Sequence, residues 1–286
     1  MMFVVTAATG QLGRLVVEQL LARVPADQVA VVVRDAAKAA DLAALGVEVR
    51  IADHGDPAAL AGVFGPGDRV LLISGNEFGT RIAQHAAVVD AATVAGVALL
   101  AYTGILGGPA TRFTVADDHH VTERLIEDSG LPYTFLRNGW YTENYTGQLP
   151  GVLASGAVIG TTAPDSRLAT ASRADYAEAA AIVLVGPGHE NATYELSGDT
   201  AWTLREYAAE VTRQSGTPVA YRPLPDADYA EILIGAGLPD FMAAVFADTE
   251  NAIGRGELAT VTGDLSRLLG RPTTPLADTI AAALAG

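Results

Sequence analysis

A turn of small residues near the start of the chain has the residue types that bind a phosphate. The apolar run Phe3–Thr6 leads into this turn, and an apolar pattern at helical spacing follows Gly13. This order predicts a strand, a tight turn and a helix. In such a junction the backbone can approach a pyrophosphate closely, and the N–H groups that open the helix point at the anion. The junction therefore predicts a dinucleotide-binding site, with an ordinary strand-to-helix turn as the alternative.

The glycine pattern departs from the usual one at a single position. The chain has Ala7-x-x-Gly10-x-x-Gly13, whereas dinucleotide-binding folds commonly carry a third glycine at the first position. Alanine tolerates positive φ poorly, so either residue 7 keeps an ordinary backbone angle or cofactor affinity is reduced. We expect the ordinary angle, since alanine adds only one methyl group. Gly13 is expected to let the helix pack close to the strand.

Two basic residues follow the second apolar run, Val29–Val33. The first polar residue after this run is Arg34, and Lys38, the only lysine of the chain, lies four residues further on. A guanidinium suits the 2′-phosphate of NADP, whereas an acidic residue at this point binds the ribose 2′-hydroxyl of NAD. The pattern favours NADP. Asp35 keeps NAD open as the alternative, and Arg34 could also be a solvated surface charge.

Polar or small residues also follow the next three apolar runs. A carboxylate such as Asp53 commonly meets the adenine amino group, small residues after the fourth run let the backbone pass beside the ribose, and the fifth run ends near the expected nicotinamide. The expected cofactor-binding residues are Thr6, Ala8, Thr9, Gly10, Gln11, Leu12, Arg34, Lys38, Asp53, Ser74, Gly75, Asn76, Tyr102 and Thr103.

The elements that must position these residues alternate along the first half of the chain. Helical patterns near residues 36–45, 57–63, 80–95 and 117–129 lie between apolar runs at Val29–Val33, Val47–Ile51, Val70–Ile73, Ala98–Tyr102 and Tyr133–Leu136. This alternation predicts an α/β fold with a doubly wound parallel Rossmann sheet, whose ligands bind at the carboxyl ends of the strands. We expect a dinucleotide-binding core over residues 1–138. Residues 139–286 are expected to complete the sheet and add a small C-terminal α+β lobe within one compact unit.

Composition excludes several classes of function. The net charge of −15 argues against nucleic-acid and anionic membrane binding, and the absence of cysteine excludes disulfides, thiolate catalysis and iron–sulfur clusters. No signal-peptide pattern and no apolar run of membrane-spanning length occurs, so a cytoplasmic protein is expected.

Motifs along most of the chain resemble those of the NmrA-like group of atypical short-chain dehydrogenases/reductases, and within it the bacterial NAD(P)H:quinone oxidoreductases. The most specific segment is Asn138–Tyr145. The others are Thr6–Gly13, Val33-Arg34, Ala52-Asp53, Leu71–Ser74, Ala101–Thr103, Asp128–Gly130, Ser172–Tyr176 and Tyr194–Asp199. The resemblance implies a Rossmann core, a small C-terminal lobe and a substrate in the cleft between them.

The chain lacks the usual catalytic pair of short-chain dehydrogenases. They use Tyr-x-x-x-Lys on the helix after the fifth strand, where this chain has His119 and Glu123. Alcohol dehydrogenation by that route is therefore disfavoured. These two side chains lie at i, i+4 and could form a proton-donating pair or a helix-stabilising one. The i, i+4 spacing is a generic helical one, so we expect no metal site.

Quinone reduction fits this loss of acid–base machinery, because hydride can pass directly from nicotinamide to an electron-poor ring. The candidate catalytic residues are Asn138, Tyr141 and His119. The candidate substrate-binding residues are Phe78, Trp140 and Tyr145, which could instead pack the junction between sheet and lobe.

The sequence thus predicts an NAD(P)H-dependent oxidoreductase that transfers hydride from NADPH to a quinone or polycyclic aromatic substrate. Two alternatives stay open, a non-catalytic NAD(P)-sensing regulator and a tailoring oxidoreductase or oxygenase of an aromatic polyketide. The expected partner is a small aromatic molecule, and assembly into a homodimer is left open.

Overall fold

The computed structural model describes residues 1–286, which form two compact units. Unit 1 contains Met1–Gly108, Asp118–Asn138 and Arg173–Glu195, and unit 2 contains Pro109–Asp117, Gly139–Ser172 and Leu196–Gly286. The segment Arg173–Glu195 thus returns to unit 1 from the second half of the chain.

A seven-stranded sheet forms the centre of unit 1, in the order β3-β2-β1-β4-β5-β6-β9. All strand pairs from β3 through to β6 are parallel. The strand order reverses between β1 and β4, which creates a switch point where ligands bind in doubly wound folds. The strands are β1 (Phe3–Thr6), β2 (Val29–Val33), β3 (Glu48–Ile51), β4 (Arg69–Leu72), β5 (Leu99–Ile105), β6 (Tyr133–Asn138) and β9 (Ala192–Leu196).

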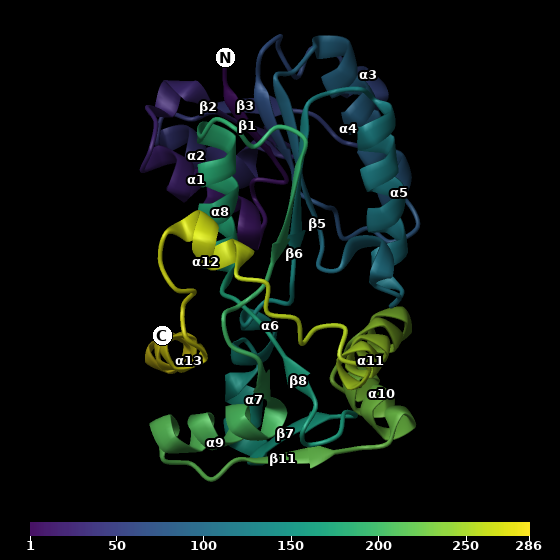
Figure 1. Ribbon diagram of the computed structural model, residues 1–286, viewed down its shortest axis with the longest axis vertical. Helices are drawn as coiled ribbons and strands as arrows, with labels where there is room; N and C mark the ends of the chain where they lie inside the picture. Colours follow the sequence, from purple (N-terminus) through teal and green to yellow (C-terminus); the bar gives the residue numbers. More distant parts are fainter. The chain divides into compact units, whose positions relative to one another are not determined.

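Helices cover both faces of this sheet (Figure 1). One face carries α1 (Gln11–Leu21), α2 (Ala40–Ala44) and α8 (Arg173–Val185), and the other carries α3 (Pro57–Leu60), α4 (Arg81–Ala95) and α5 (Val115–Asp128). Short 3₁₀ turns complete the connections at η1 (Ala26–Gln28), η2 (Ala36–Ala39) and η3 (Gly108–Ala110). Because both faces are covered, the central strands are apolar throughout, and β2 is buried at every position.

The apolar core of unit 1 holds the strand ends in place. Val4, Val32, Leu72, Leu100 and Phe135 come from five different strands and are all buried in one cluster. Burying a side chain of this size contributes about 1.5–3 kcal/mol relative to leaving it exposed. The cluster therefore fixes the strands against one another and so fixes the loops that leave their carboxyl ends.

Unit 2 is built from two small sheets and several helices. β7 (Ala157–Gly160) pairs in parallel with β11 (Ala220–Pro223), and β8 (Arg167–Leu168) pairs antiparallel with β10 (Trp202–Thr203). The helices are α6 (Glu143–Thr146), α7 (Leu149–Ser155), α9 (Leu204–Ser215), α10 (Asp226–Gly235), α11 (Asp240–Gly254), α12 (Asp264–Leu269) and α13 (Leu276–Ala285). Helix α10 packs on α11, and α13 packs on α9.

The fold confirms the predicted parallel Rossmann sheet with additional small sheets in the C-terminal half. The short elements α6, α7, β8, β10 and α12 were not predicted, because their few residues carry too little apolar periodicity. None of the helices is both long and apolar enough to cross a membrane.

Candidate functional site

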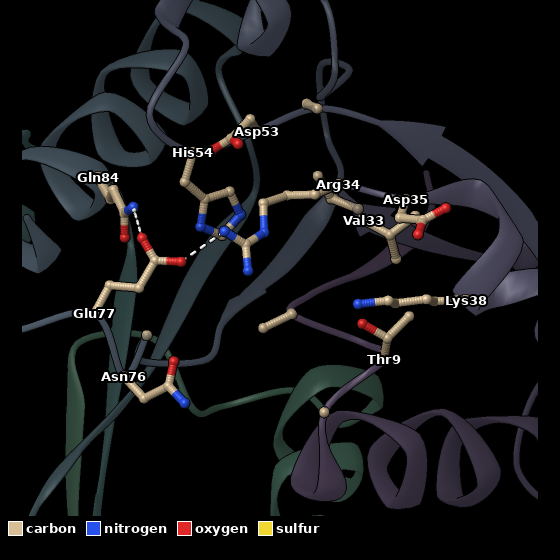
Figure 2. Close-up of a pocket in the computed structure, with 15 residues that line it drawn as sticks. Thr9, Val33, Arg34, Asp35, Lys38, Asp53, His54, Asn76, Glu77 and Gln84 are labelled. Atoms are coloured by element: carbon tan, nitrogen blue, oxygen red, sulfur yellow. Dashed lines mark hydrogen bonds and ion pairs between the residues drawn. The ribbon is translucent and has the colours of Figure 1, made fainter. Parts of the chain in front are cut away.

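A cavity of about 230 Å³ lies at the carboxyl ends of β1, β2, β3 and β4 in unit 1. Figure 2 shows its side chains, which come from the end of β2, from the loops after these four strands and from α4. This is the switch-point position expected for a ligand in a doubly wound fold. The lining residues are Ala7, Thr9, Gly10, Val32, Val33, Arg34, Asp35, Lys38, Ala52, Asp53, His54, Gly75, Asn76, Glu77 and Gln84.

The turn after β1 corrects one expectation. Ala7 has φ of +49°, in the left-handed region, so the prediction of an ordinary backbone angle was wrong. The chain must reverse within three residues here, because the Gly10 N–H donates to the Ala7 carbonyl at 3.0 Å. An L-residue in the left-handed conformation costs about 1–2 kcal/mol, and the turn keeps it despite this strain.

Helix α1 begins at the end of this turn with an open N-terminus. Gly10 is the N-cap residue and makes no side-chain capping bond, and the first turn of the helix carries no acidic residue. The backbone N–H groups of that turn have no acceptor within the helix, which makes it a ready anion site. A Cβ on Gly13 would lie 2.5 Å from the Ala7 carbonyl oxygen and 2.7 Å from the Ala8 Cα. This confirms that Gly13 is needed for close packing of the helix on the strand end.

Arg34 and Lys38 bring positive charge to the cavity, with both side chains directed into it (Figure 2). The Arg34 Nη1 donates to Glu77 Oε1 at 2.6 Å. Asp35 is the residue that could have bound the ribose of NAD. Its side chain accepts from the Ala37 N–H at 2.9 Å and so caps η2. Its carboxylate points away from the space between the two basic groups in Figure 2.

Three polar residues of the wall were not predicted: His54, Glu77 and Gln84. His54 and Glu77 directly follow the predicted Asp53 and Asn76, so extending each strand-end segment by one residue would have found them. Gln84 lies within α4, and its Nε2 donates to Glu77 Oε2 at 2.7 Å. No sequence signal marks it, since only the packing of α4 brings it to the cavity. Burial lowers the pKa of His54 below its ordinary value.

Two predicted cofactor-binding residues, Thr6 and Thr103, bond the backbone at the end of β4. The Thr6 hydroxyl oxygen accepts from the Ile73 N–H at 3.1 Å, and the Thr103 hydroxyl oxygen accepts from the Ser74 N–H at 2.9 Å. These bonds hold the end of β4 between its two neighbouring strands. The predicted residues outside the cavity wall are Thr6, Ala8, Gln11, Leu12, Ser74, Tyr102 and Thr103.

His119 and Glu123 have different partners, although they are one helical turn apart. The Tyr102 hydroxyl and His119 Nδ1 lie 2.7 Å apart, and both side chains are buried. Both Glu123 oxygens accept from Arg137, at 2.9 and 2.7 Å, and Arg137 also donates to Glu195 at 2.8 Å. Burial lowers the pKa of His119 to about 3 and raises that of Tyr102. Both groups are therefore neutral near pH 7, and the expected His119–Glu123 pair does not form.

Asn138 ends β6 in a buried position of unit 1. Its backbone carbonyl accepts from the Leu106 N–H at 3.0 Å, whereas its side-chain Oδ1 has no hydrogen-bond partner. Buried polar atoms in folded proteins are nearly always paired, so this acceptor is available to a donor from a ligand or from an ordered water molecule.

Comparisons with known proteins agree with this geometry. A model of a family described as NAD(P)H-binding matches residues 7–187. The chain belongs to the NAD(P)H-binding family. It is 48% identical over 279 residues to quinone oxidoreductase 2 of Escherichia coli K12, covering 98% of this chain and 97% of that protein.

Two solved structures of similar proteins superpose on nearly the whole chain. An E. coli NADPH-dependent quinone oxidoreductase in complex with NADPH has a TM-score of 0.95 and 47% identity, covering 99% of this chain and 100% of that one. A Citrobacter triphenylmethane reductase in complex with NADP(H) has a TM-score of 0.93 and 39% identity, covering 98% and 99%. These findings confirm the resemblance to NmrA-like short-chain dehydrogenases/reductases and bacterial quinone oxidoreductases.

The aromatic candidates of this NAD(P)H-binding protein have contacts of their own. In unit 1, the Phe78 ring lies 4.4 Å from the Arg81 guanidinium carbon. In unit 2, the Trp140 carbonyl accepts from the Ala171 N–H at 3.3 Å, and Tyr141 forms a β-bridge with Ala171.

Tyr145 lies in unit 2 and packs edge-to-face with Trp202, with the two ring centroids 5.2 Å apart. It also lines a second cavity of about 650 Å³, together with Tyr207 and the buried Glu250. The Glu250 carboxylate accepts from the Thr161 N–H at 2.9 Å, which ties α11 to the end of β7. A role of Tyr145 toward substrate stays a prediction.

We expect His119→Ala to retain quinone reductase activity within about tenfold of the parent protein, since general acid catalysis, where it matters, is worth 10²–10⁴-fold. A neutral, buried imidazole bonded to Tyr102 holds no readily available proton near pH 7. Steady-state kcat with NADPH and a quinone checks this. A loss of 100-fold or more, in a folded variant with unchanged NADPH affinity, would show that His119 is catalytic.

Proposed function

We propose that this protein is an oxidoreductase that uses NADPH to reduce quinones or similar flat, electron-poor aromatic molecules. The observation that carries the cofactor assignment is the cavity in unit 1, where an uncapped helix N-terminus and two basic side chains converge. The E. coli relative, named as a quinone oxidoreductase and nearly half identical over its full length, supports the substrate class.

The residues present fit NADPH. The backbone N–H groups that open α1 would bind the pyrophosphate, because they are unpaired within the helix and no acidic side chain opposes an anion there. Arg34 and Lys38 would bind the 2′-phosphate through charge-assisted hydrogen bonds. The unpaired Oδ1 of Asn138 would accept a hydrogen bond from the nicotinamide carboxamide.

Bound NADPH supplies the hydride for this chemistry. The protein contributes orientation more than acid–base catalysis. Burial lowers the pKa of His119 to about 3, so its imidazole carries no extra proton near pH 7, and burial raises the pKa of Tyr102, which makes its hydroxyl a weaker acid. Arg137 is fully engaged by Glu123, which lies on the same helix as His119, and by Glu195. A quinone tolerates this arrangement, since it accepts hydride without a strong acid and its oxygens can take protons from water.

We expect NADPH to bind at least tenfold more tightly than NADH, equivalent to about 1.4 kcal/mol. Arg34→Ala is expected to remove most of this preference by raising the Kd for NADPH and leaving that for NADH nearly unchanged. Titration of nucleotide fluorescence gives both constants. The matched control is Arg205→Ala, which removes an exposed arginine from α9 in unit 2. Equal affinities for the two nucleotides in the unmutated protein would contradict the assignment.

An assay of NADPH oxidation against a panel of quinones, with and without oxygen, tests the activity itself. Quinone-dependent oxidation that persists without oxygen is the expected result. Tight NADPH binding without turnover of any quinone would contradict the proposed activity and favour a nucleotide-sensing role, whereas turnover that requires oxygen would favour an oxygenase.

A further inference from the structure

We infer that Glu77 is a specificity-determining residue that competes with the cofactor's 2′-phosphate for Arg34. This inference rests on the proposed use of NADPH. It adds a residue that weakens the preference for NADPH over NADH.

The Glu77 carboxylate is bound on both sides within the cavity. Its Oε1 accepts from Arg34 Nη1 at 2.6 Å, and its Oε2 accepts from Gln84 Nε2 at 2.7 Å. Figure 2 shows the three side chains in a row, with the Arg34 guanidinium turned toward Glu77. One nitrogen of the guanidinium that would bind a phosphate is therefore already paired with a carboxylate.

The other two carboxylates of the cavity do not compete for this guanidinium. Asp35 accepts from the Ala37 N–H at 2.9 Å, and Asp53 accepts from the Gly55 N–H at 2.8 Å. Each carboxylate therefore bonds the backbone of its own loop. Glu77 alone among them bonds Arg34. The hydrogen bond from Gln84, followed by Arg34, lowers the pKa of Glu77, which keeps it charged at neutral pH.

Binding of a 2′-phosphate must alter this pair. A phosphate monoester carries a charge of about −1.5 to −2 near pH 7, and its geometry favours a bidentate contact with the guanidinium. Either Arg34 leaves Glu77 to make that contact, or the phosphate sits beside a carboxylate of the same sign. Both outcomes reduce the affinity that the 2′-phosphate adds to cofactor binding. NADH lacks this group and leaves the pair intact.

The test compares 2′,5′-ADP with 5′-AMP, because these probes differ only by the 2′-phosphate and require no turnover. Glu77→Gln is expected to lower the Kd for 2′,5′-ADP about fivefold, the scale of an exposed ion pair, and to change that for 5′-AMP less than twofold. Calorimetric titration of the full chain measures both. Glu77 is partly exposed, so the thermal transition should not move.

Two further variants separate the ion pair from a general charge effect. Asp35→Asn removes the same charge from the same cavity while keeping an acceptor for the Ala37 N–H, and it should change the Kd for 2′,5′-ADP less than twofold. In an Arg34→Ala background, Glu77→Gln should lower the Kd for 2′,5′-ADP less than twofold.

Unchanged or weaker binding of 2′,5′-ADP by Glu77→Gln overturns the inference, since Glu77 would then align Arg34 for the phosphate. The inference is also overturned if Asp35→Asn lowers the Kd for 2′,5′-ADP as much as Glu77→Gln does. Failure of the unmutated protein to prefer 2′,5′-ADP over 5′-AMP is a different result, which contradicts the proposed use of NADPH.

Discussion

Gly10→Val is expected to raise the Kd for NADPH at least about 100-fold, equivalent to about 2.7 kcal/mol, while leaving the fold largely intact. Gly10 is exposed, lines the cavity and occupies the N-cap position of the helix whose N–H groups would bind the pyrophosphate. A branched side chain there fills the space that the anion needs. The fold tolerates the change, because φ of −77° and ψ of 169° are ordinary extended angles for valine.

Fluorescence titration of NADPH with the purified variant measures this loss, and far-ultraviolet circular dichroism monitors the fold. Gly10→Ala is the graded control. Its Cβ would lie 3.2 Å from the Ala7 carbonyl oxygen, a tight but tolerable contact, so its affinity should fall between those of the parent and the valine variant. Unchanged affinity in a folded Gly10→Val protein would remove the phosphate-binding assignment from this turn.

Gly13→Ala, three residues further along, is expected to lower the free energy of unfolding by about 2 kcal/mol. Alanine favours the helical conformation by about 1 kcal/mol over glycine. Here, however, the added Cβ would lie 2.5 Å from the Ala7 carbonyl oxygen, a backbone atom that can move only if the strained turn after β1 moves with it. Overpacking in a well-packed site costs about 1–3 kcal/mol and occasionally more, so the clash outweighs the gain in propensity.

Gly151→Ala is the matched control, because Gly151 lies within α7, is exposed, and has no atom within 4 Å of an added Cβ. This substitution should leave stability unchanged or raise it by up to about 1 kcal/mol. Urea unfolding followed by circular dichroism compares the two. Equal stability of the Gly13→Ala and parent proteins would show that the turn after β1 can move to accept the added Cβ. That result would contradict the close packing of α1 on the turn.

The order of apolar runs determined the fold of unit 1. Each buried strand of a parallel sheet is a continuous apolar run, and β2 was predicted with its observed bounds, Val29–Val33. Because parallel strands end at one edge, residues such as Arg34 and Asp53 could be expected to converge without knowledge of the packing. The same reasoning identified Gly10 and Gly13, whose spacing follows from the local geometry of a strand-to-helix turn.

Only the tertiary structure decided which side chains pair and which backbone positions carry strain. Helical spacing made His119 the near neighbour of Glu123, but β6 brings Arg137 to that carboxylate and β5 brings Tyr102 to that imidazole. A guanidinium and a carboxylate attract more strongly than a neutral imidazole and a carboxylate, and residues far apart in sequence meet only through the strand register.

The positive φ of Ala7 and the Arg34–Glu77 pair have a similar origin. Glycine is the usual signal for a left-handed residue, so an alanine there is visible only in the folded chain. Arg34 and Glu77 lie in loops after different strands, and the pair forms because β1 places β2 and β4 on its two sides. Local sequence thus specified the elements and the edge at which chemistry occurs, while contacts between elements decided the charge state and pairing of each group within the site.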